Sequence, residues 1–204
     1  MNQSIYTTHS VRMTRTGFKI NGDERIYNRM KKVCFALSLA LCSAAFAQNN
    51  TVVRWRQVVG VITAPGVNNP VAGITDSKGN TTAQIDSGTA PWTTRGGSAR
   101  INLATGEGSF DVEGLVLNGG SATGTPGPIK SVVGTLVCNP GAATQAIIDT
   151  QSVDLSSHGN AELSFKLNVP PACASPLFLI RIPQFGLRWI ATGAVPVASS
   201  ASDF

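Results

Sequence analysis

Glycine and proline interrupt this sequence so often beyond residue 47 that a long helix has no room to form. Of the 204 residues, 157 follow Ala47, and these contain 19 of the 21 Gly and all 11 Pro. Gly disfavours a helix interior through its backbone entropy, and Pro through its missing N–H. No stretch of a dozen residues places apolar side chains at helical spacing without such an interruption. The sequence therefore favours β-structure.

Alternation of apolar and polar side chains indicates the individual strands. It is cleanest at residues 161–169, where every second residue is apolar, and it recurs within residues 51–63. The six residues Leu177–Ile182 are apolar on both faces apart from Arg181, which is typical of a strand that is covered on both sides. Further strands are predicted at about 130–138, 175–182 and 187–193.

Two segments have the pattern of hairpins. Residues 100–117 surround a Gly-containing turn at 104–108, and residues 151–169 surround a turn at 156–160. In all, seven to nine short strands at spacings of roughly ten residues predict a single-domain, antiparallel β-sandwich of Ig-like type. We expect this domain to span residues 48–197, with a flexible tail at 198–204.

The segment before residue 48 predicts an export signal. Residues 30–32 (MKK) are basic, residues 33–42 are apolar, and small residues precede a cleavage site between Ala47 and Gln48. A membrane-spanning helix needs about 20 apolar residues, so we expect cleavage and no stable membrane insertion. Residues 1–29 are a predicted upstream extension without structure, with translation starting at Met30; the alternative is an unusually long signal n-region. Either way, the protein is predicted to be secreted or periplasmic.

The basic charge of the chain lies entirely in this leader. The formal charge is +5, and residues 1–47 carry seven basic and two acidic side chains, whereas the remainder carries nine of each. Proteins that bind nucleic acid neutralise phosphates with clustered Lys and Arg. A neutral domain therefore predicts no nucleic-acid partner.

Cys138 and Cys173 are the two cysteines that remain after residue 47. In an oxidising compartment an even number of cysteines predicts a disulfide, and two of them allow one pairing. Closing a loop of about 35 residues stabilises the fold by about 4 kcal/mol on the chain-entropy model. His158 is the one histidine after residue 47, so two Cys and one His cannot complete a closed four-ligand zinc site unless carboxylates take part. No metal or cofactor is predicted.

No set of catalytic residues is predicted. Asp154, Ser156, Ser157 and His158 resemble the components of a hydrolase, but they fall in a predicted hairpin turn, where such residues bond the local backbone. No nucleophile elbow accompanies them. We therefore interpret these residues as a turn.

Three other residues are candidates for binding a glycan. Asp111 and Glu113 project from one face of a predicted strand, and such carboxylates can bind Ca²⁺ or act on sugars, although a solvated strand face explains them more simply. Trp92 lies in a predicted loop and is the candidate for an exposed stacking platform, whereas Trp55 and Trp189 lie in predicted strands and are expected in the core. The Gly-rich segment 118–127 predicts a long flexible loop, which is the best location for a ligand.

The sequence from about residue 109 to 195 also carries a longer pattern. It contains VVGTLVC ending at Cys138, then VDL and GNA-x-L-x-F, then PPAC-x-SPLFLIR and WIATG. This pattern resembles a group of uncharacterised secreted bacterial proteins. The resemblance implies a signal peptide, one disulfide and an all-β domain, without an assigned activity.

Two functions follow as hypotheses. The first is an exported, non-enzymatic β-sandwich protein of structural or binding type. The alternative is a secreted glycan-binding or glycan-active protein that uses Trp92, Asp111 and Glu113. The expected partner is an extracellular glycan or protein.

Overall fold

The computed structural model describes residues 52–199. The predicted signal peptide, its cleavage site at Ala47 and Gln48, segment 1–29 and residues 200–204 lie outside the described residues. Within the described part, every strand pairing of the sheets is antiparallel, and the helical content is one short 3-10 turn, η2 (Pro183–Phe185). The predicted antiparallel all-β class is confirmed. No helix in this part is long and apolar enough to cross a membrane.

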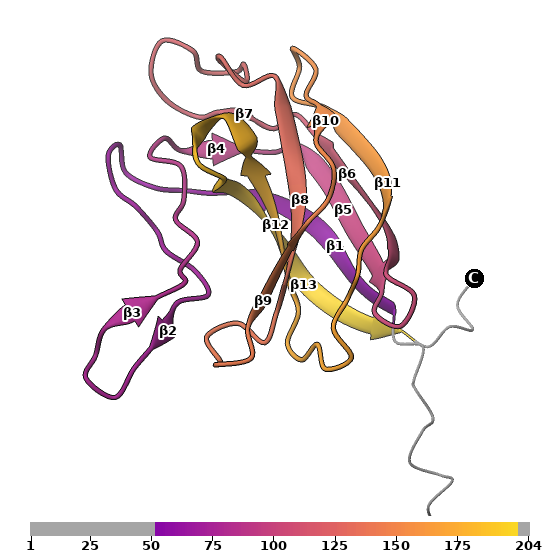
Figure 1. Ribbon diagram of the computed structural model, residues 1–204. Coiled ribbons are helices and arrows are strands. Elements are labelled where there is room, and N and C mark those ends of the chain that lie inside the picture. Colours follow the sequence, from indigo (N-terminus) through magenta and orange to yellow (C-terminus); the bar gives the residue numbers. More distant parts are fainter. Residues whose placement is uncertain (1–51, 200–204) are drawn as a thin grey trace, which may run out of the picture. The chain divides into compact units, whose positions relative to one another are not determined.

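One large sheet contains nine of the thirteen described strands (Figure 1). Its hydrogen-bonded order is β10-β8-β12-β13-β1-β5-β6-β11, and β9 pairs with β8 beside this path. The bounds of its members are β1 (Val52–Gly60), β5 (Gly96–Asn102), β6 (Glu107–Glu113), β8 (Ser131–Cys138), β9 (Ala146–Asp149), β10 (Val153–Asp154), β11 (Ala161–Lys166), β12 (Leu177–Ile182) and β13 (Arg188–Ser199). The remaining strands form two short pairs, β2 (Ile74–Thr75) with β3 (Thr81–Thr82), and β4 (Trp92–Thr93) with β7 (Val116–Leu117).

The large sheet curls into a half-barrel around its core. Phe178 of β12 and Phe110 of β6 have ring centroids 5.6 Å apart, although three strands separate β12 from β6 in the sheet. Trp55 of β1 lies 5.5 Å from Phe178. Gly134 of β8 permits this close packing, because a Cβ there would lie 2.9 Å from the Phe110 ring. The predicted sandwich is thus formed by one sheet that folds onto itself, since a wide twisted sheet curls rather than staying flat.

Of the two predicted hairpins, the first is confirmed and the second is confirmed only as a turn. β5 and β6 pair directly, with Gly96 opposite Glu113. The turn at 155–160 also forms, with the Ser156 N–H donating to Asn160 O over 3.0 Å. Its flanking strands do not pair, because β10 hydrogen-bonds to β8 and β11 to β6 at the two edges of the sheet. This turn carries the chain from one edge to the other.

β13 extends further than the sequence predicts. The predicted strand ends at residue 193, but β13 reaches Ser199, where Val52 pairs with Ser199 and Val53 with Ala198. The first two residues of the predicted tail therefore belong to the sheet. Ala198 and Ser199 are small residues that do not by themselves indicate a strand. They belong to the sheet because their backbone groups pair with those of β1.

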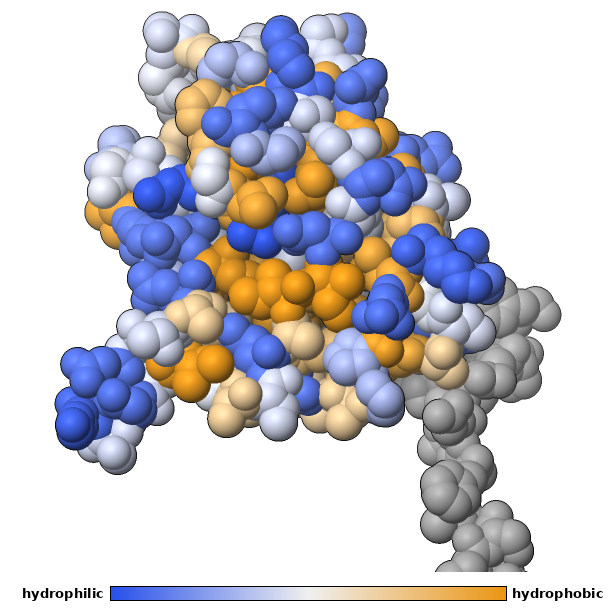
Figure 2. All heavy atoms as spheres, viewed as in Figure 1, coloured by the Kyte–Doolittle hydropathy of each residue, from blue (hydrophilic) through white to orange (hydrophobic). Residues whose placement is uncertain are grey.

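The prediction that β12 is covered on both sides is confirmed. Leu179 and Ile180 are neighbours that face opposite sides of the strand, and both are fully buried. Segment 61–91 lies against the adjacent β13, where the Trp189 indole N–H donates to Asn69 O over 2.9 Å. The β2–β3 arm projects from this segment (Figure 1) and is hydrophilic (Figure 2).

The turn of this arm is held by a carboxylate. Asp76 accepts hydrogen bonds from the side chain and backbone N–H of Asn80 and from the Lys78 N–H. These bonds, that of the Asn80 side chain foremost, lower the pKa of the Asp76 carboxyl below its usual value. All its partners lie within four residues, so this carboxylate shapes the turn.

Candidate functional site

Trp92 is not an exposed platform, and this prediction is wrong. Its side chain is only 3% exposed, and it lies in β4, where Trp92 pairs with Leu117 of β7. A strand of two residues leaves no alternation in the sequence, so the segment resembled a loop. The predictions for the other two tryptophans are confirmed, since Trp55 and Trp189 both belong to the core.

Asp111 and Glu113 lie on one face of β6, opposite the buried Phe110 and Val112, as the alternation predicts. Asp111 Oδ1 accepts a hydrogen bond from Ser98 Oγ of the neighbouring strand over 2.6 Å. Glu113 is exposed. Trp92 is buried in the separate β4–β7 pair, and neither carboxylate lines the pocket that contains Trp92. The three candidate glycan residues therefore do not form one exposed surface.

The Ser-His-Asp interpretation gives way to the turn, as expected. Ser156 Oγ accepts hydrogen bonds from the backbone N–H groups of His158 and Asn160, over 3.3 and 3.0 Å. Gly159 has φ +77°, which a residue with a side chain rarely adopts. These residues therefore stabilise the chain reversal between β10 and β11.

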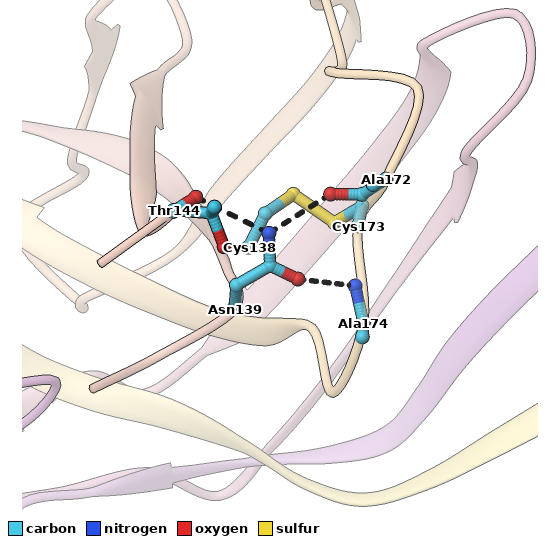
Figure 3. Close-up of a disulfide and its surroundings, with 6 residues drawn as sticks. All are labelled: Cys138, Asn139, Thr144, Ala172, Cys173 and Ala174. Atoms are coloured by element: carbon cyan, nitrogen blue, oxygen red, sulfur yellow. Dashed lines mark hydrogen bonds between the residues drawn. A yellow bond between two sulfur atoms is a disulfide. The ribbon is translucent and has the colours of Figure 1, made fainter. Parts of the chain in front are cut away.

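The predicted disulfide between Cys138 and Cys173 is present and closes a separation of 35 residues. Asn139 reinforces it: its Nδ2 donates to Ala172 O over 2.9 Å, and its Oδ1 accepts from the Ala174 N–H over 2.7 Å (Figure 3). The loop around Cys173 is thus held on both sides by one neighbouring side chain. This end of β8 is closed covalently and by hydrogen bonds.

An ion pair that the sequence did not predict joins Arg181 of β12 to Asp149 of β9. Arg181 Nη1 is 3.0 Å from Asp149 Oδ1, its Nε donates to Leu187 O over 2.5 Å, and Thr135 Oγ1 donates to the same carboxylate. Arg181 is 8% exposed. The available signal was a lone charge within an apolar strand, because a buried charge requires a partner. The described contacts of Arg181 all join it to other parts of the sheet and its turns, so we assign this ion pair a role in stability.

An apolar pocket of about 500 Å³ lies where β12 ends. Pockets that hold small ligands usually have volumes of about 300–1,000 Å³. Figure 1 shows the arrow of β12 directed toward the β4–β7 pair, which contributes two of the walls. The lining comes from four parts of the chain: Gly88, Thr89, Ala90, Trp92, Leu117, Pro126, Pro128, Ile129, Ile182, Phe185 and Arg188.

Sequence reasoning located this pocket only in part. The segment 118–127, predicted as the best place for a ligand, contributes Pro126, and the residues that follow it contribute Pro128 and Ile129. Trp92 was singled out, but it forms a buried wall. Phe185 and Arg188 were missed, because the short η2 turn that places them has no periodic signal. Phe185 is 52% exposed, so its ring adds accessible apolar surface at this turn.

A second hollow of about 470 Å³ is lined by residues of β1, β5, β6 and β11. Its lining mixes apolar and polar side chains: Val52, Arg100, Ile101, Asn102, Glu107, Gly108, Ser109, Ser164 and Phe165. Lys166, next to Phe165, forms a surface ion pair with Glu107 over 3.5 Å. Lacking an exposed aromatic ring, this hollow offers no stacking surface for a sugar.

The described residues offer no alternative metal centre, because no three His, Cys, Asp or Glu side chains among them are grouped to hold an ion. The apolar pocket at the end of β12 is the candidate binding site. No family model, curated protein or solved structure matches this chain.

Proposed function

We propose that this protein is an exported, non-enzymatic binding protein that holds a small apolar ligand in the pocket at the end of β12. The observation that carries this proposal is the composition of the pocket wall. Leu117, Ile129 and Ile182 form apolar surface around about 500 Å³, and Phe185 stands exposed at the η2 turn. Burying such surface against a ligand is favourable at roughly 25 cal/mol per Å².

Export is supported by one prediction from the sequence and one feature of the structure. A signal peptide is predicted at 30–47 and would direct the chain out of the cytosol, and a disulfide such as Cys138–Cys173 persists in oxidising compartments. A secreted or periplasmic location is consistent with both, as is the resemblance to secreted bacterial β-proteins. The glycan alternative loses its stacking platform, since Trp92 is buried.

Binding of a neutral apolar fluorophore, N-phenylnaphthylamine, tests the proposal. We expect its fluorescence to rise on addition of the purified protein. Ala90→Trp places a large ring in the pocket and should weaken probe binding about tenfold, by loss of the apolar contact area. Ala104→Trp, in the exposed β5–β6 turn, is the matched control and should bind as the parent does. Equal binding by the parent and Ala90→Trp, or no binding by the folded parent, contradicts the proposal.

A further inference from the structure

The pocket at the end of β12 has one charged residue in its wall. Arg188, the first residue of β13, contributes a half-buried guanidinium to a lining that is otherwise apolar or small. No Asp or Glu lines the pocket. A negatively charged ligand would therefore meet a cation there without repulsion from a carboxylate.

Arg188 retains donors that the protein does not use. A guanidinium has five N–H donors, and of these Nη1 donates to Ser87 O over 3.0 Å. The two ion pairs found among residues 52–199 join Lys166 to Glu107 and Arg181 to Asp149. Arg188 takes part in neither. Arg181, by contrast, has a carboxylate and a carbonyl as partners. The guanidinium of Arg188 therefore has fewer partners within the protein than that of Arg181.

The two tryptophans nearby show the same contrast. The indole N–H of Trp189 donates to Asn69 O over 2.9 Å. Trp92 is 3% exposed as a residue, and its indole N–H makes no side-chain hydrogen bond like that of Trp189 within residues 52–199. Its Nε1 lies beside the pocket residue Gly88, because a Cβ built there would be 3.6 Å away. Trp92 lines the pocket, and a donor on a pocket wall is suited to a ligand's oxygen.

We infer that the pocket takes an amphipathic anion, a small molecule with an apolar chain or ring and one carboxylate. This inference rests on the proposed function and specifies its ligand class. The carboxylate binds the guanidinium of Arg188 through charge-assisted hydrogen bonds, which are stronger than neutral ones and often bidentate. The Trp92 N–H is a second donor on the same wall. The apolar body lies against Leu117, Ile129 and Ile182.

Competition between a carboxylate and its neutral counterpart tests the inference. Sodium dodecanoate and dodecanol have the same chain, so each is used to displace N-phenylnaphthylamine from the purified protein, below micelle-forming concentrations. We expect dodecanoate to compete at least tenfold better. Arg188→Gln should lower dodecanoate affinity about tenfold and leave dodecanol unchanged, with Arg188→Lys retaining part of the preference. Arg95→Gln removes an exposed charge outside the pocket and should have no effect.

The outcomes separate this inference from the proposed function. Equal competition by dodecanoate and dodecanol overturns the anion preference and leaves apolar binding intact. An unchanged dodecanoate affinity in Arg188→Gln, with circular dichroism as in the parent, overturns the role of Arg188. If the folded parent does not bind the probe at all, the proposed function fails, and this inference fails with it.

Discussion

The two ends of the β8–β12 pair are built in opposite ways. At one end Cys138, the last residue of β8, is bonded to Cys173, and Asn139 ties the adjoining loop with hydrogen bonds. At the other end Ile182, the last residue of β12, lines a pocket in which Arg188 and the Trp92 N–H keep unused donors. Polar groups at the disulfide end form hydrogen bonds within the protein, whereas donors at the pocket end remain available for a ligand.

Removing the disulfide should have the largest effect on this comparison. Cys138→Ala with Cys173→Ala should lower the free energy of unfolding by about 4 kcal/mol, because the unfolded chain regains the entropy of a 35-residue loop. Urea unfolding followed by tryptophan fluorescence measures this change. Probe affinity of the molecules that remain folded should not change. A loss below about 1 kcal/mol would show that the closed end does not hold the fold.

Breaking the buried ion pair of Arg181 and Asp149 should have the next largest effect on the free energy of unfolding. Asp149→Ala leaves the guanidinium of Arg181 buried without its carboxylate and should cost about 3 kcal/mol. The matched control is Glu107→Ala, which breaks the exposed pair with Lys166 and should cost less than about 1 kcal/mol. Equal costs in thermal unfolding would argue against a structural role for the buried pair.

Asn139→Gly tests how much the hydrogen bonds beside the disulfide contribute to the free energy of unfolding. Asn139 has φ +52°, a conformation that Gly adopts freely, so the substitution removes the side-chain hydrogen bonds without backbone strain. We expect a loss of about 1–2 kcal/mol in urea unfolding. Repeating the measurement without the disulfide gives a double-mutant cycle. Strict additivity there would mean that Asn139 and the disulfide act independently.

The smallest effect on stability should come from the pocket end. Phe185→Ser removes a half-exposed ring and should change the free energy of unfolding by no more than about 0.5 kcal/mol. Probe binding should nevertheless weaken several-fold, because the ring lines the pocket. A large loss of stability with unchanged probe binding would show that Phe185 stabilises the fold and does not contribute to the pocket.

Local patterns predicted those elements whose signal lies within the element itself. The alternation in 161–169 predicted β11, and the apolar run Leu177–Ile182 predicted a doubly covered β12. The cysteine count after residue 47 predicted the pairing. Two-residue strands and the η2 turn carry no such period, which is why Trp92 was misplaced and Arg188 was missed.

The sequence by itself determined that this domain is β-structured, because Gly and Pro exclude long helices, and it determined the disulfide and the core positions of Trp55 and Trp189. Only the tertiary structure decided that the strands form one curled sheet and that loops distant in sequence meet in a pocket. The physical reason is range: alternation depends on neighbouring residues, whereas strand order and pocket walls depend on contacts between segments far apart in the chain.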